Sequence, residues 1–228
     1  MRSEWCEHKG NAVLLVEGQN DCHVTLALCK SHQLDETFGI YDCGNDTKAL
    51  NRMNALIASS IPPKVIGLMI DADRPNLAGR WASIQSKLSN YDYVFPQYPT
   101  PSGTIVHSQQ GLPRLGFWLM PNNRVDGMLE DFCCEMIDAQ ASATVEQCLN
   151  VAEMSGYASF KAVHRSKAFV HTYLAWQDEP GRPLGQAITA QVLRDNTATA
   201  ETFVEWLKVL FDEQSTVIHG SYVDLSLV

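Results

Sequence analysis

The N-terminal half of the chain alternates short, uninterrupted apolar runs with stretches of helical character. Four runs predict strands, at residues 12–16, 38–41, 65–70 and 114–120. Helices are expected between them at about 21–31, 46–59 and 76–88, with Asp46 or Thr47 capping the second helix. Strands without polar interruptions are typical of a sheet that is covered on both faces. Strand–helix–strand alternation therefore favours an α/β fold with a mostly parallel sheet flanked by helices.

The pattern changes in the second half of the chain. The Pro- and Gly-rich segment 95–113 predicts a loop or an irregular hairpin. After residue 126 the periodicity is helical, and the candidate helices are 127–137, 143–155, 161–177, 184–193 and 198–211. We therefore expect an α/β domain over residues 10–137 and a helical C-terminal extension, residues 138–228, packed on it.

Composition narrows the class of protein. The 228 residues include 45% apolar and 19% charged side chains, which is ordinary for a globular protein, and carry a net charge of −9. This charge excludes a broadly basic nucleic-acid-binding surface, but a nuclease can approach phosphates through bound divalent metals and one local basic patch. No apolar run reaches the ~18 residues of a membrane span. The seven scattered cysteines predict reduced thiols in a cytoplasmic protein.

Carboxylates follow two of the apolar runs. Glu17 comes directly after the first run, and Asp71 and Asp73 end the third. In parallel α/β folds, ligands bind beyond the carboxyl ends of the strands. Taken singly, a Glu-Gly after a strand is usually a turn, and an Asp-x-Asp is usually a loop or a helix cap. Carboxylates that meet at one edge would repel one another without a cation, and Mg²⁺ or Mn²⁺ is the natural choice.

Two segments resemble the motifs of the Toprim domain. Residues 13–21, Val-Leu-Leu-Val-Glu-Gly-Gln-Asn-Asp, resemble its first motif, and residues 66–73, Ile-Gly-Leu-Met-Ile-Asp-Ala-Asp, resemble its Asp-x-Asp motif. The resemblance covers about residues 10–125 and implies a Rossmann-like Toprim fold. The chain has no G-x-x-x-x-G-K-[ST] loop. It therefore resembles small stand-alone Toprim proteins related to OLD-like and phage-defence nucleases.

The resemblance implies Mg²⁺- or Mn²⁺-dependent cleavage of phosphodiester bonds. Asp71 and Asp73 would hold the principal ion, and Glu17 would act as a general acid/base or as a ligand of a second ion. Glu130 and Asp131, in a segment that resembles an acidic helix start of nuclease-type Toprims, would complete a second metal site or its surroundings.

Two further roles accompany this assignment. Asp21, on the first turn of the helix after Glu17, is expected to cap that helix or to support the metal ligands from outside. A cation should also face the phosphate. The resemblance assigns this catalytic and phosphate-binding role to Lys167, which shares about 60° of a helical wheel with His164 and His171. That face can equally be a solvated polar surface.

Other basic residues could widen such a patch. Arg74 directly follows the Asp-x-Asp motif, and Arg124 precedes Glu130. Lys161 and Arg165 lie beside the face that carries His164 and Lys167.

Three functions remain open from the sequence. The first is a nuclease for DNA or RNA that serves defence or repair, with an ATPase partner that regulates it. The second is a phosphoryl-transfer enzyme for a small nucleotide or phosphate ester, which suits the negative charge. The third is a non-catalytic Toprim-like module that binds an ATPase partner. A homo-oligomer is compatible with all three functions. No membrane partner is expected.

Overall fold

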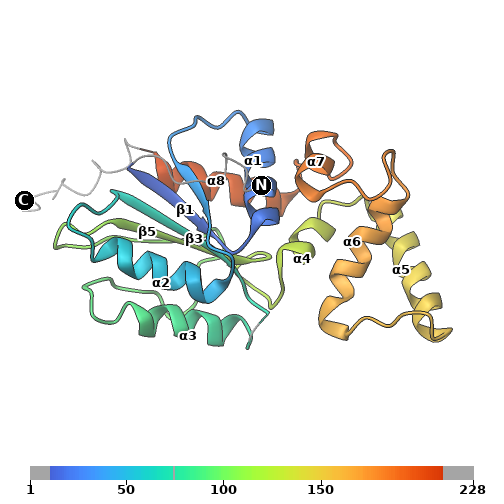
Figure 1. The fold of residues 1–228 in the computed structure, drawn as a ribbon, viewed down its shortest axis with the longest axis horizontal. Coiled ribbons are helices and arrows are strands. Elements are labelled where there is room, and N and C mark those ends of the chain that lie inside the picture. Colours follow the sequence, from blue (N-terminus) through green and yellow to red (C-terminus); the bar gives the residue numbers. More distant parts are fainter. Residues whose placement is uncertain (1–10, 74, 213–228) are drawn as a thin grey trace, which may run out of the picture.

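The computed structural model describes residues 11–73 and 75–212, which form a five-stranded sheet flanked by helices (Figure 1). The strand order is β2-β1-β3-β5-β4. Strands β1, β2, β3 and β5 run parallel, and β4 pairs antiparallel with β5. The strands are β1 (Ala12–Val16), β2 (Gly39–Asp42), β3 (Val65–Asp71), β4 (Thr104–Val106) and β5 (Arg114–Met120). The predicted α/β class with a mostly parallel sheet is confirmed, and the architecture is compatible with a Rossmann-like fold.

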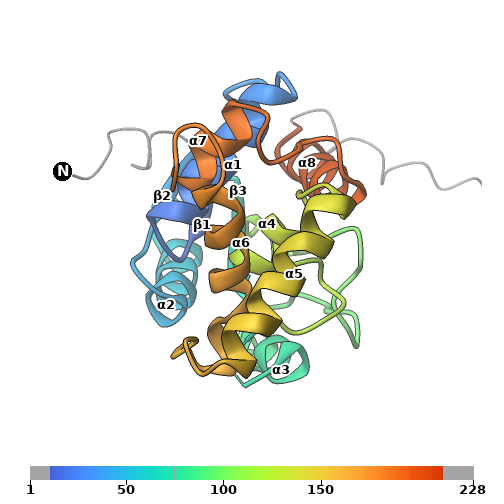
Figure 2. The ribbon, with the colours of Figure 1, turned by 90° about the vertical axis from the view of Figure 1, so that its right-hand side faces the viewer.

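The helices fall into two groups. Those that cover the sheet are α1 (Gln19–Ser31), α2 (Asp46–Ile57), α3 (Leu77–Lys87) and α8 (Ala198–Phe211). Those that gather beyond the end of β5 are α4 (Leu129–Cys134), α5 (Ala139–Met154), α6 (Arg165–Ala175, preceded by a 3-10 turn at Ala162–His164) and α7 (Leu184–Thr189). Figure 1 shows α2 and α3 on one face and α1 and α8 on the other; Figure 2 looks onto α5 and α6. Asn45 caps α2 through its side chain, which accepts from the Lys48 N–H at 2.8 Å, so the expected cap at Asp46 or Thr47 is wrong.

Alternating strand residues build one core on each face of the sheet. Leu14 and Val16 pack with the side chains of α1, α4 and α8, whereas Val13 and Leu15 pack with those of α2 and α3. Successive residues of a strand point to opposite faces. A strand that is buried on both sides must therefore be apolar throughout, which explains the uninterrupted runs in the sequence.

The C-terminal segment shares the core of the sheet. The α8 ring Phe203 packs against Trp118 of β5 at 5.1 Å between centroids and against Phe132 of α4 at 5.7 Å. Leu210 of α8 lies over Gly116, where an added Cβ would come within 2.3 Å of it. Residues 138–212 therefore complete one layer of the α/β unit as well as forming the helical group beside it.

The Pro- and Gly-rich segment 95–113 contains a strand that the sequence did not predict as a sheet member. Thr104 of β4 pairs with Phe117 of β5 in antiparallel register. Because β4 has only three residues, its place depends on pairing with β5 more than on its own apolar pattern.

Among the described cysteines, Cys29, Cys43, Cys133, Cys134 and Cys148 are free thiols, as expected. Cys22 is disulfide-bonded, so the prediction of reduced thiols is wrong at this position. Within the described ranges, every helix falls short of the length and apolar character that crossing a bilayer demands.

Candidate functional site

Glu17 and Asp71 lie side by side at the carboxyl edge of the sheet. Strands β1 and β3 are parallel neighbours with Val16 opposite Met69, so the residues that end these strands meet. The Glu17 side chain accepts a hydrogen bond from the Asp71 N–H at 2.8 Å. The structure thus brings together two of the carboxylates that the sequence singled out.

The Asp71 carboxyl is largely surrounded by protein. Its Oδ1 accepts from the Leu129 N–H at the start of α4 at 3.0 Å. Burial, and after it the neighbouring carboxylates of Asp21, Glu17, Glu130 and Asp73, together raise the pKa of Asp71 to about 9. In the absence of a cation, Asp71 therefore holds its proton more tightly than an exposed aspartate does.

Asp21 is a buried acid of this cluster. Its residue is 7% exposed, and its Oδ1 has no hydrogen-bond partner. Burial, with a smaller contribution from Glu17, raises its pKa to about 8. Gly18 is the N-cap of α1, and a backbone hydrogen bond from Gly18 to the Asp21 carboxyl acts to lower its pKa, as expected of an acid in the first turn of this helix. A buried carboxyl oxygen without a partner is costly, and a cation at this edge would offset that cost.

Two residues of the site, Asp46 and Arg80, were not among the site residues expected from the sequence. Asp46, at the start of α2, forms an ion pair with Arg80 of α3, and the Arg80 Nε–H donates to the Asp71 carbonyl at 3.0 Å. The pKa of Glu17 is raised chiefly by burial and next by Asp46, whereas Arg80 lowers it. Asp46 follows the carboxyl end of β2, beside β1. The same strand-end rule that selected Glu17 could therefore have selected it.

Glu130 and Asp131 separate although they are adjacent in sequence. Glu130 is buried and contacts the Lys167 ammonium at 3.0 Å, and it also raises the pKa of Asp71. Asp131 instead accepts from the Met128 N–H at 2.8 Å and from the Ser166 hydroxyl. The helix geometry thus places Glu130 on the side of Asp71, while Asp131 caps α4.

The expected phosphate-binding cations have different environments. Lys167 pairs with Glu130, yet its side chain remains 51% exposed. His164 is half-buried, and its Nδ1 has no hydrogen-bond partner. Arg165 pairs with Glu146 and Glu153, both at 2.9 Å, and so belongs to the α5–α6 contact.

The other cations contribute less to the site. His171 and Arg124 are exposed, as is Lys161. Arg74 lies outside the described residues.

The carboxylate oxygens of the site suit a hard cation, but the carboxylates are not spaced so that they surround one. Asp71, Asp21, Glu17 and Glu130 supply oxygen atoms, which Mg²⁺ prefers. No group of three or more His, Cys, Asp or Glu side chains in residues 11–73 and 75–212 is arranged so that it could hold a metal ion. A bound ion would therefore have to draw these carboxylates closer together than they lie here.

Comparison with known proteins gives one match. The model of a family described as "Protein of unknown function (DUF3226)" matches residues 11–212. Neither the search of curated proteins nor the search of solved structures found a match.

Proposed function

The chain belongs to the DUF3226 family, and we propose that it is a Toprim-type, Mg²⁺-dependent nuclease that hydrolyses phosphodiester bonds. The observation that carries this proposal is the unpartnered Oδ1 of buried Asp21, beside the carboxylates of Glu17 and Asp71. A buried carboxyl oxygen without a partner is costly, and a bound metal ion would favour the ionised carboxylate and occupy that oxygen. Mutual repulsion at this edge gives a divalent ion a favourable place to bind.

The residues of the site divide into two groups of opposite charge. Asp71 and Asp21, with Glu17 and Glu130 as neighbours, would hold the ion, and Asp73 follows Asp71 on the same edge. When bound, Mg²⁺ supplies a Lewis acid for the phosphate and lowers the pKa of a bound water.

Lys167 supplies the positive charge of this site. Its half-exposed ammonium, placed by Glu130, is positioned to balance charge that develops on a phosphate. The Glu17 carboxyl, whose pKa burial raises, is suited to accept or donate a proton at the reacting oxygen.

The test is cleavage of plasmid DNA and of a structured RNA with Mg²⁺ or Mn²⁺. We compare the wild-type chain with Glu17→Gln and Asp71→Asn, which keep the side-chain oxygens that accept the hydrogen bonds described above. Asp35→Asn, at an exposed position, is the matched control. We expect the control to keep wild-type activity and the two site variants to lose at least about 100-fold. Equal cleavage by all four proteins would remove these carboxylates from the chemistry.

A non-catalytic module that binds an ATPase partner is the second candidate. Two observations favour this module. Lys167 is already paired with Glu130, and the carboxylates are spaced as in a structural network that holds no metal ion. Calorimetric titration with Mg²⁺ separates the two functions. Saturable binding that Asp71→Asn abolishes supports the nuclease, and the absence of any heat of binding supports the module.

A further inference from the structure

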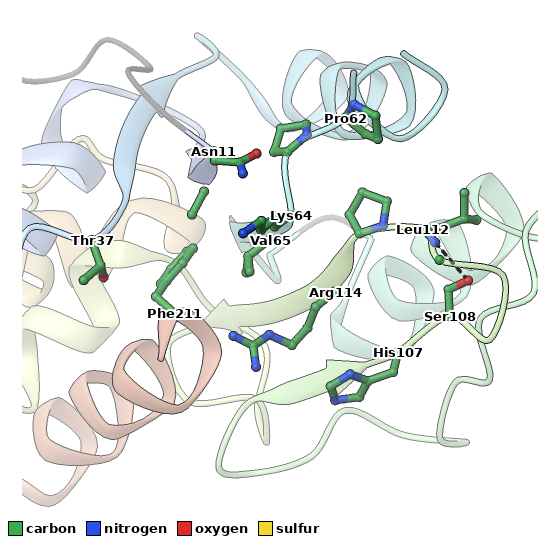
Figure 3. Close-up of a pocket in the computed structure, with 14 residues that line it drawn as sticks. Asn11, Thr37, Pro62, Lys64, Val65, His107, Ser108, Leu112, Arg114 and Phe211 are labelled. Carbon is green, nitrogen blue, oxygen red and sulfur yellow. Dashed lines mark hydrogen bonds between the residues drawn. The ribbon is translucent and has the colours of Figure 1, made fainter. Parts of the chain in front are cut away.

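A separate cavity lies at the opposite edge of the sheet, at the amino ends of the strands (Figure 3). Its volume is about 600 Å³, and its walls include Ala12, Val65 and Arg114, which begin β1, β3 and β5. Ligand pockets typically measure about 300–1,000 Å³. Because these strands are parallel, this cavity lies at the other end of the sheet from Glu17 and Asp71.

The charge of this cavity is opposite to that of the whole chain. Among residues 11–73 and 75–212, its lining includes Lys64, His107 and Arg114 and has no Asp or Glu, although the chain carries a net charge of −9. Figure 3 shows these three side chains around one opening, with Asn11 and Phe211 also on its border. Basic groups gathered around one opening favour an anionic ligand.

Arg114 is the buried member of this group. The residue is 7% exposed, and one terminal nitrogen donates to the Asp212 carbonyl at 2.9 Å. Its Nε is buried without a hydrogen-bond partner. A guanidinium recognises phosphate through a fork of N–H groups, and Arg114 brings such a group to the wall of the cavity. The Asp212 carboxylate, which lies close enough to interact with Arg114, stands outside the lining.

The remaining wall is apolar and partly aromatic. Phe211 stacks on Phe38 with 3.8 Å between ring centroids and borders the cavity together with Val65 and Leu112. A flat apolar group can pack against such a wall. The side chains of Asn11 and Thr37 add hydrogen-bonding groups.

We propose that this cavity binds a small phosphorylated molecule of nucleotide size. The phosphate lies against Arg114, Lys64 and His107, and the flat apolar part lies against Val65 and Phe211. The permanent positive charges of Arg114 and Lys64 suit the double negative charge of a phosphate monoester better than the single charge of a carboxylate. This binding does not depend on the function proposed above, because the two sites share no residue.

The experiment measures binding of AMP, inorganic phosphate and adenosine to the full chain by calorimetry in the presence of EDTA. Chelation removes divalent ions, so the result is independent of the carboxylate site. We expect AMP to bind saturably at one site, more tightly than phosphate, while adenosine binds weakly. Lys64→Ala should raise the Kd of AMP about tenfold, because it removes a hydrogen bond to a charged group. His107→Ala should also weaken binding, and Lys87→Ala, at an exposed position on α3, should not.

Arg114→Lys tests the buried guanidinium, since it keeps the charge and removes the fork. We expect a loss of AMP affinity with an unchanged melting temperature. Because a buried substitution can impair folding, the exposed positions Lys64 and His107 decide the outcome. Absence of saturable AMP binding, or wild-type affinity in both Lys64→Ala and His107→Ala, would overturn the proposal. Phosphate that binds as tightly as AMP would overturn the role of the apolar wall.

Discussion

The substitution Asp71→Asn tests whether the carboxylates at the carboxyl edge destabilise the metal-free fold. Asparagine has nearly the same shape, and its side-chain oxygen can still accept the Leu129 N–H. It removes the ionisable group whose pKa burial and the neighbours Asp21, Glu17, Glu130 and Asp73 raise to about 9. The variant therefore removes the ionisable group while keeping the hydrogen bond from the Leu129 N–H.

The sign and the size of the effect follow from the pKa of Asp71. The folded state binds this proton more tightly than the unfolded chain, whose pKa is near 3.8. The free energy of unfolding therefore falls as the pH rises from about 4 to about 9. About three pH units separate the ordinary pKa of an aspartate from pH 7, and each unit corresponds to ~1.4 kcal/mol. The free energy of unfolding therefore falls by at most ~4 kcal/mol between about pH 4 and pH 7. Because the ionised carboxylates of Asp21 and Asp71 repel each other, protonation of either one lowers the cost of ionising the other. We expect about half of this limit, ~2 kcal/mol, to be recovered by Asp71→Asn at pH 7.

The assay is urea denaturation in EDTA at pH 5 and pH 8. Wild type and the exposed control Asp35→Asn should share a stability that falls with pH. Asp71→Asn should be more stable at pH 8 and should show a weaker pH dependence. Mg²⁺ should stabilise the wild type and leave Asp71→Asn unchanged, because only binding to the folded state raises stability. A variant that is less stable than wild type at pH 8, with the same pH dependence, would refute the repulsion argument.

Three further substitutions test the packing around the site. Gly116→Ala should destabilise the fold by about 1–3 kcal/mol in urea denaturation, because the added Cβ would overlap Leu210; an unchanged midpoint would show that α8 can shift away. Phe132→Ala should cost about 3–5 kcal/mol in the same assay, because Phe132 is fully buried against Phe203, and a cost below ~1 kcal/mol would contradict this packing. Lys167→Ala should lower the melting temperature more than Lys161→Ala, because it leaves buried Glu130 without its cation; equal melting temperatures would show that the ion pair contributes nothing to stability.

The order of the main elements and the position of the strand-end carboxylates could be predicted from the sequence alone. Buried parallel strands must be apolar on both faces, so β1, β3 and β5 appear in the sequence as continuous apolar runs. Glu17 and Asp71 stand at the ends of two of these runs. The local pattern is sufficient here because each of these strands is long enough to carry its own signal.

Features that depend on contacts between distant segments could be read only from the folded chain. The three residues of β4 become a strand only by pairing with β5, and α8 becomes a layer of the sheet because Gly116 leaves room for Leu210. The burial of Asp21, the pairing of Glu130 with Lys167 and the meeting of Lys64 with Arg114 likewise arise only in the fold. Burial and charge pairing are properties of a residue's neighbours in space, and no periodicity along the chain encodes them.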